Sequence, residues 1–292
     1  MLRMRSGFLG AALAAAVAAP SRAQVPLPAT APPAYTITLG PRDACLTPET
    51  RGQARVDAGG IEVATPTAAT LTATLTGAAA ANAYLGHTGE ATATLHLVQQ
   101  FEVACSDPSA ATFALTVDSA LAGLVRSRHK GLACARVASA SITPAGCTNC
   151  PPIVVAHPPL CVEGTAGRLC NRNLPTLKVP SLPLGKYTLV ADLVLVAEGS
   201  GLADGHAAAD FSPSAALPAD WVRARDPFQG VDKKNFGLGV TLSVAATPGS
   251  ALAAAAVAAS APRRDAVVAR SSAPSMGAAR RDIKGYERVM RR

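Results

Sequence analysis

Large aromatic side chains are scarce in this chain of 292 residues. Six Phe, four Tyr and one Trp make up 4% of it, whereas apolar residues as a whole reach 49%. Much of the apolar content is alanine, so a core must be built largely from small aliphatic side chains. Such side chains either leave room for an apolar ligand between two layers or form a thin, filled core. The apolar content itself excludes a wholly disordered chain.

Long apolar runs and catalytic motifs are also missing. No run reaches the roughly 20 apolar residues of a membrane-spanning helix, which excludes an integral helical membrane protein. The HExxH, GxSxG, P-loop and EF-hand patterns are absent, and the five His residues stand singly. His96 and Asp192 fall on strand faces, where an outward polar side chain is the simpler interpretation of each. We therefore expect no enzyme activity, no metal and no cofactor.

Positive charge is lacking from the part of the chain that is expected to fold. The formal net charge is +8, but residues 24–250 hold 15 basic and 16 acidic residues. Residues 1–23 contribute three Arg and no acid, and residues 251–292 contribute nine basic and three acidic residues. A nucleic-acid binder carries its charge on the folded module. We therefore expect no specific nucleic-acid partner, although the basic tail is a candidate contact for an anionic surface.

The N-terminus has the order of a secretory signal peptide. Arg3 and Arg5 precede an apolar run at 7–19, and Ser21 and Ala23 occupy the −3 and −1 positions of a cleavage site before Gln24. A mitochondrial transit peptide is the alternative, because the segment is rich in Arg and free of acid. We predict that residues 1–23 are a signal peptide, that a Pro-rich leader follows at 24–34, and that the protein is secreted or lumenal.

Cysteine usage agrees with export. Four of the seven cysteines fall between 147 and 170, and an oxidising compartment favours at least two disulfides that involve Cys147, Cys150, Cys161 and Cys170. Their connectivity stays open. A zinc site with four Cys ligands, or with His157, is the alternative, but the second cysteine pair lacks the spacing of a zinc knuckle. A CxxC redox motif belongs at a helix N-terminus, which Pro151 and Pro152 disfavour. The odd count leaves at least one thiol unpaired, and Cys134 is the expected one.

The apolar pattern predicts an all-β protein. Apolar and polar residues alternate strictly in several Thr-rich segments, which is typical of half-buried strands. These segments are 36–39, 69–76, 91–98, 100–105, 111–117, 187–197 and 236–244. No long amphipathic helix separates them, which favours an immunoglobulin-like (Ig-like) antiparallel β-sandwich over 35–245.

The remaining segments are expected to be less regular. A short helix is predicted at 118–124, and a loop or one helical turn at 77–84. Eight prolines and the four clustered cysteines make 144–183 a disulfide-stapled loop region, and 206–235 is expected to be irregular. The Ala-rich basic segment 246–292 is predicted to be a disordered tail.

Two stretches resemble the ML lipid-recognition family. Pro183, Gly185, Tyr187 and Thr188 match a "Pro-x-G-x-Tyr-Thr" motif, and the segment 180–212 is similar to that family's last hairpin. The stretch 60–77 is similar to an early strand of the family, with Val63 and Pro66 spaced one residue wider, and 147–170 occupies the place of its mid-domain disulfide loop. The resemblance implies a secreted Ig-like sandwich that holds a lipid between its two sheets.

Two functions therefore remain for this chain. The first is a non-catalytic lipid-binding protein with a lipid or sterol in an apolar slot between the sheets. The inward residues of the expected strands would line that slot: Leu95, Leu97, Phe101, Val103, Phe113, Leu115, Leu189, Leu193 and Leu195. The second is a structural or adhesive extracellular module, in which the same side chains are ordinary core. The sequence leaves the oligomeric state open.

Overall fold

A computed structural model describes residues 33–83, 86–147, 149–201, 205–214 and 230–248. The predicted signal peptide, most of the Pro-rich leader and the basic tail from 249 lie outside these residues. The described residues form strands and no helix. This part of the chain therefore contains no helix that could cross a membrane. The all-β prediction is confirmed.

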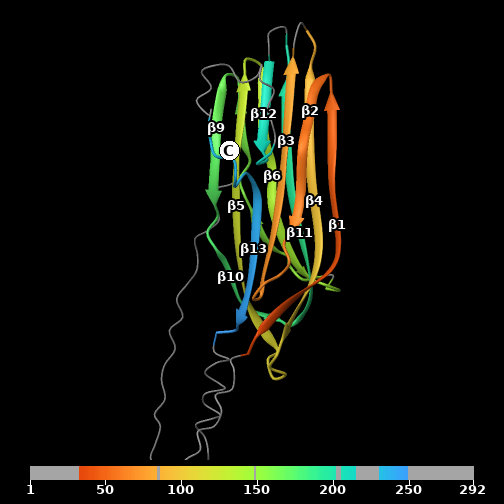
Figure 1. Ribbon diagram of the computed structural model, residues 1–292, viewed down its shortest axis with the longest axis vertical. Helices are drawn as coiled ribbons and strands as arrows, with labels where there is room; N and C mark the ends of the chain where they lie inside the picture. The colour runs from red at the N-terminus through yellow and green to blue at the C-terminus, as the bar shows by residue number, and fades with distance from the viewer. Residues whose placement is uncertain (1–32, 84–85, 148, 202–204, 215–229, 249–292) are drawn as a thin grey trace, which may run out of the picture. The chain divides into compact units, whose positions relative to one another are not determined.

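The strands belong to two antiparallel sheets (Figure 1). Sheet A contains β1 (Tyr35–Arg51), β4 (Gly89–Cys105), β6 (Gly131–Pro144), β7 (Ile153–Ala156), β8 (Leu160–Glu163) and β11 (Gly185–Gly199). Sheet B contains β2 (Gln53–Val63), β3 (Thr70–Ala83), β5 (Thr112–Arg128), β9 (Ala166–Asn173), β10 (Leu177–Pro183), β12 (Gly205–Phe211) and β13 (Gly237–Ala246). The predicted sandwich is therefore confirmed.

Short strands lie end to end in both sheets. In sheet A the order is β1-β4-β11-β6, and β7 and β8 pair with successive parts of β6. In sheet B, β12 and β13 together fill the space between β3 and β5, as Figure 1 shows. In the same sheet β2 pairs with β3, while β9 and β10 pair with β5. Each sheet therefore has five strand positions, and the chain changes sheet repeatedly between them.

Period-two alternation explains which side chains enter the core. In β11, Leu189, Ala191 and Leu193 are fully buried, and the residues between them are only half-buried. Inward and outward side chains alternate because successive residues of a strand point to opposite faces of the sheet. Inward residues from both sheets form one continuous hydrophobic cluster.

Side chains inside sheet A grow in size from one end to the other. Residues directly opposite one another on β4, β11 and β6 form rows across the sheet. From the narrow end, four of these rows are Gly89–Gly199–Gly131, Ala91–Ala197–Ala133, Leu95–Leu193–Ala138 and Phe101–Tyr187–Pro144. Sheet B follows the same trend, since Ala81 pairs with Ala207 toward the narrow end and Leu71 with Leu242 further along. The core is therefore tapered.

The narrow end is closed by backbone. A Cβ atom placed on Gly199 would lie 2.5 Å from the carbonyl oxygen of Gly205 and 2.9 Å from the amide nitrogen of Ala83, both in sheet B. A Cβ atom on Gly131 would lie 2.2 Å from the His206 carbonyl oxygen. Glycine is required here because the two sheets approach too closely for any side chain.

The wide end is filled by aromatic rings from both sheets. The rings of Phe101 and Tyr187 in sheet A stack with centroids 5.6 Å apart, and Phe113 of sheet B meets Tyr187 edge-on at 5.5 Å. The hydroxyl of Tyr187 donates to the Pro183 carbonyl at 2.5 Å, which satisfies the polar end of a buried ring. One further buried ring, Phe211 of β12, lies away from this end and packs beside Gly123 of β5.

Several local predictions were wrong. The segment 77–84 is not a helical turn, since β3 continues to Ala83, and 118–124 is not a helix but part of β5. The segment 131–144 forms a strand that was not predicted, and four short strands run through the expected loop region at 144–183. The expected irregular segment 206–235 begins with most of β12. At 77–83 and 118–124, strand pairing overrides the helical preference of alanine.

Candidate functional site

The nine predicted ligand-binding residues all lie in the interior of the sandwich. Those of sheet A are Leu95, Leu97, Phe101 and Val103 on β4 and Leu189, Leu193 and Leu195 on β11; those of sheet B are Phe113 and Leu115 on β5. Each is at most 2% exposed, and all nine belong to the same hydrophobic cluster. The structure therefore brings the predicted set together between the two sheets.

Two pockets of the described residues lie elsewhere. One, with a volume of about 490 Å³, lies on the outer face of sheet B over Thr74, Thr76 and Gly239. The other, of about 280 Å³, adjoins it at the β2 edge and shares Glu62 and Thr74 with it. None of the nine predicted residues lines either pocket. The lining of the larger pocket mixes the apolar side chains of Ala120, Pro213 and Phe236 with charged and hydroxyl groups, whereas the smaller pocket is lined mainly by polar atoms.

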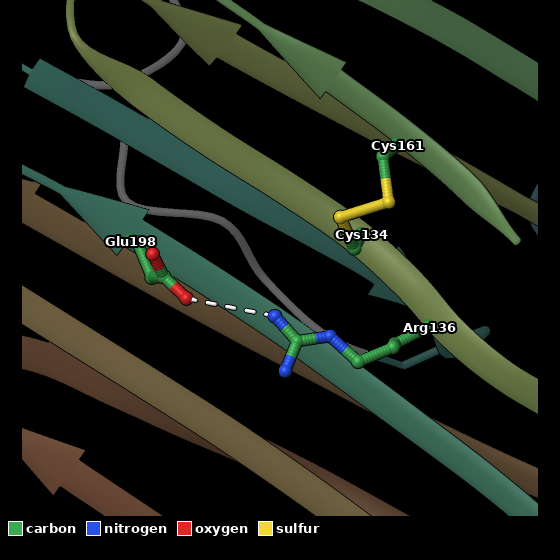
Figure 2. The surroundings of a disulfide bond; sticks show 4 residues. All are labelled: Cys134, Arg136, Cys161 and Glu198. Atoms are coloured by element: carbon green, nitrogen blue, oxygen red, sulfur yellow. Dashed lines mark ion pairs between the residues drawn. A yellow bond between two sulfur atoms is a disulfide. The ribbon is translucent and has the colours of Figure 1, made fainter.

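The disulfides differ in part from the prediction. Cys147 is bonded to Cys150, and Cys161 is bonded to Cys134 rather than to another cysteine of the cluster. Figure 2 shows the second bond joining β6 to β8, beside an ion pair in which Arg136 and Glu198 are 3.8 Å apart. Two disulfides form as expected, but Cys134 is not the unpaired thiol.

Three cysteines are unpaired: Cys45, Cys105 and Cys170. The expectation that Cys170 is disulfide-bonded is wrong, because β9 places it inside the sandwich, where its Sγ lies 3.4 Å from the Leu121 carbonyl oxygen. Burial raises the pKa of the Cys170 thiol, against the opposing charges of Arg172 and Arg168. Three of the four cysteines of the alternative zinc site are bonded in disulfides and cannot bind a metal as thiolates. Within the described residues, no three His, Cys, Asp or Glu side chains form a cluster that could hold a metal ion.

A Ser–His pair lies inside the sandwich where sequence reasoning did not expect one. The hydroxyl of Ser119 on β5 is 2.9 Å from Nε2 of His157, which follows β7, and both residues are buried. Burial, followed by the charge of Arg172, lowers the pKa of His157. Its Nδ1 has no hydrogen-bond partner among the described residues, so the pair lacks the carboxylate that orients a catalytic imidazole.

His96 and Asp192 interact across neighbouring strands. Nδ1 of His96 on β4 lies 2.6 Å from Oδ1 of Asp192 on β11, and the two side chains are 37% and 34% exposed. The sequence placed each residue on a strand face but did not pair them. Their partnership depends on the register of β4 against β11, which places the two residues directly opposite each other.

Asp210 is a fully buried carboxyl group on the outer side of β12. Its Oδ2 lies 2.5 Å from Nζ of Lys233, and its Oδ1 accepts a hydrogen bond from the Ser212 amide. Burial raises the pKa of Asp210, and the contact with Lys233 opposes that rise. The pair joins β12 to the segment before β13 and faces away from the nine apolar residues.

Comparison with known proteins adds no function to this geometry. The chain matches no family model, no curated protein and no solved structure. The stretch 180–212 contains β11 and β12, which lie in different sheets and do not pair with each other. The function must therefore be argued from the residues of this chain.

Proposed function

We propose that the protein is a non-catalytic structural or adhesive module of an oxidising compartment, with a core filled by its own side chains. One observation carries the proposal: all nine candidate slot residues are at most 2% exposed within one cluster. Two features obstruct the ends of this hydrophobic cluster. At the narrow end the backbones of the two sheets meet at the glycine row, Gly89–Gly199–Gly131, and at the wide end aromatic rings pack around Tyr187. A packed interior of this kind is the expected state of a core without a ligand.

The disulfides support the compartment in this proposal. Disulfides form and persist in secreted and lumenal proteins and are rare where thiols are kept reduced. The chain has two of them, Cys134–Cys161 and Cys147–Cys150. They agree with the predicted export of the chain, and the signal peptide itself lies outside the described residues.

Lipid binding is the competing proposal. Its support is that both sheets direct apolar side chains toward each other, so a lipid or sterol would meet hydrocarbon on two sides. It requires the sheets to separate, and separation would expose the same side chains that now bury one another. The two proposals therefore differ in what an enlarged side chain does at the sheet interface.

The deciding experiment enlarges residues on one face of β11. Ala191→Phe and Leu193→Trp each add a ring between the sheets, and Val190→Phe adds a ring to the half-buried outer face of the same strand as a control. In a filled core, the inward variants overpack and lose about 1–3 kcal/mol of unfolding free energy. The outward variant changes little. Denaturant melts measure these losses, and displacement of a fluorescent sterol or fatty acid measures ligand binding.

The lipid proposal predicts the opposite pattern. The inward variants would keep their stability while saturable lipid binding falls, because the ring occupies the space of the ligand. Mass spectrometry of organic extracts from the purified exported protein gives an independent check. A stoichiometric lipid in that extract, together with stable inward variants, overturns the filled-core proposal.

A further inference from the structure

Cys45, His96 and Asp192 form one row across three neighbouring strands of sheet A. In the register of the sheet, Cys45 on β1 lies directly opposite His96 on β4, which lies directly opposite Asp192 on β11. Residues directly opposite each other point to the same face, with Cβ atoms about 4.5–5.5 Å apart. All three therefore belong to the outer face, and Cys45 is exposed there.

Cys45 has no thiol of its own chain within reach. Cys105 lies nine residues along β4 from His96, a distance of about 30 Å at the rise of a strand. Cys170 is on β9, at the edge of sheet B opposite to β2, whereas Arg42 of β1 bonds to the Ile61 carbonyl of β2. A disulfide needs Cα atoms within about 7 Å of each other. The other four cysteines are already bonded to one another.

The contact between His96 and Asp192 fixes the roles of the two ring nitrogens. A carboxylate only accepts hydrogen bonds, so the Nδ1 that faces Asp192 carries the proton. Nε2 is then the nitrogen that can take a proton from a neighbouring thiol. The sheet register places Cys45 next to this imidazole, and a base oriented by a third group is what the activation of a thiol requires.

We propose that Cys45 is a thiol–disulfide exchange site, with His96 as its base and Asp192 as the group that positions His96. The substrate class is a low-molecular-weight disulfide, and the product is a covalent adduct on the outer face of sheet A. The proposal goes beyond the structural role proposed above, since one covalent adduct per chain requires no turnover. Exchange needs an accessible thiolate and no enclosed pocket, which suits an open sheet face.

The reaction balances without another oxidant. The Cys45 thiol gives its proton to Nε2 of His96, and the thiolate attacks one sulfur of the disulfide. The new bond joins Cys45 Sγ to that sulfur as the original sulfur–sulfur bond breaks. Cys45 is oxidised, the departing thiolate is the reduced product, and it takes the proton from the imidazolium of His96.

The surroundings of the row contain little other charge. Positions two residues away on the same strands and face are Asp43, Thr47, Thr94, Val98, Val190 and Val194. Ser139 of β6 continues the row beyond Asp192. Asp43 is the one charged residue among these seven, and its negative charge opposes thiolate formation. The proposal therefore assigns the base at Cys45 to His96, the imidazole directly opposite it in the register.

The test measures exchange at Cys45 in the full exported chain. The probe is 5,5′-dithiobis(2-nitrobenzoate), an aromatic disulfide whose departing thiolate is coloured, and adducts with oxidised glutathione are mapped by mass spectrometry. We expect Cys45 to give the fastest phase at pH 7 and Cys45→Ser to remove it. His96→Gln should slow that phase at least about tenfold, because only a few per cent of an ordinary thiol is ionised near pH 7 without a base. Asp192→Asn should slow it less, and Thr94→Val, a neighbour on the same face, should leave it unchanged.

A pH series separates base assistance from a change in exposure. Near pH 10 an ordinary thiol, with a pKa of about 8.5, is ionised without help, so wild type and His96→Gln should react at equal rates. Thermal melts establish that each variant is folded. The proposal is overturned if folded His96→Gln and Asp192→Asn both react like wild type at pH 7. It is also overturned if the fast phase survives Cys45→Ser.

Discussion

Single polar residues inside the sandwich are expected to contribute to the response of its stability to acid. Ser119 and His157 share one hydrogen bond across the interior, and burial lowers the pKa of the imidazole. No local pattern indicated this pair, because the two residues are 38 positions apart and lie in unrelated segments. The disulfide partners escaped prediction for a similar reason. Cys134 faces Cys161 only because 131–144 is a strand, and its weak alternation did not indicate one.

The pair leads to a prediction about pH. The pKa of His157 is lowered in the folded protein. Between the pKa of the folded state and that of the unfolded state, the unfolded chain therefore binds a proton that the folded chain does not bind. The contribution of His157 to stability is therefore complete above the ordinary histidine pKa of about 6.5 and is lost as the pH falls below it. Urea melts between pH 5 and 8 should show a decline at the acid end that His157→Gln reduces.

His87→Gln is the matched control, because His87 is exposed. It should leave the pH dependence of the unfolding free energy as it is in the wild type. Asp210, whose pKa is raised, acts in the opposite direction at lower pH, but it is present in all three proteins and cancels in the comparison. A decline of equal size in His157→Gln and wild type would contradict the prediction.

Whole strands were easier to predict than their ends. Alternation located β4, β11 and β13 because each carries large apolar residues on one face and polar residues on the other. It failed at 77–83, where alanine on both faces produces no period. Alanine has little intrinsic preference for strands, and the close approach of the two sheets selects it there. The distance between the two sheets depends on the tertiary structure, so no local sequence pattern could predict it.

The glycine row provides a test at the level of the strand. Gly199→Ala should destabilise the protein by about 1–3 kcal/mol, because the new methyl group would lie 2.5 Å from the Gly205 carbonyl oxygen. Gly239→Ala is the control, since a Cβ atom on this strand glycine meets its nearest neighbour only at 3.9 Å. It should stay within about 0.5 kcal/mol of wild type. Denaturant melts that give equal losses for the two variants would show that the sheets separate easily.

For the whole molecule, composition identified the class of fold and little of its topology. Thr-rich alternation and the absence of helical periodicity were enough to predict a sandwich. The order of strands was not predictable, since β3, β4, β5 and β6 alternate between the two sheets and pair over long sequence separations. The nine candidate slot residues all lie on the inward faces because strict alternation places every second residue of a strand on one face; their role as ligand contacts stays a prediction.

Removal of residues 251–292 tests the predicted boundary of the fold. The last strand of the described residues ends at Ala246, and the truncation removes nine basic residues that lie outside the described part of the chain. Thermal unfolding should match that of the full chain, while binding to vesicles with anionic lipid should fall, because the attraction of the basic segment depends on charge and is screened by salt. A substantially lower melting temperature would place the boundary further toward the C-terminus.

The taper of the core also solves an alignment problem that this composition creates. Strands made of alternating Thr, Ala and Leu look alike after a slip of two residues, and such a slip keeps every apolar side chain on the inner face. Rows that grow from Gly through Ala and Leu to Phe and Tyr remove the ambiguity. A β11 shifted by two positions toward the narrow end would place Ala197 where only glycine fits and would leave the wide end short of its ring. The gradient of side-chain size therefore selects the register of the strands. Several registers satisfy the polarity pattern equally well, but only one of them matches the sizes of the side chains and has the lowest energy.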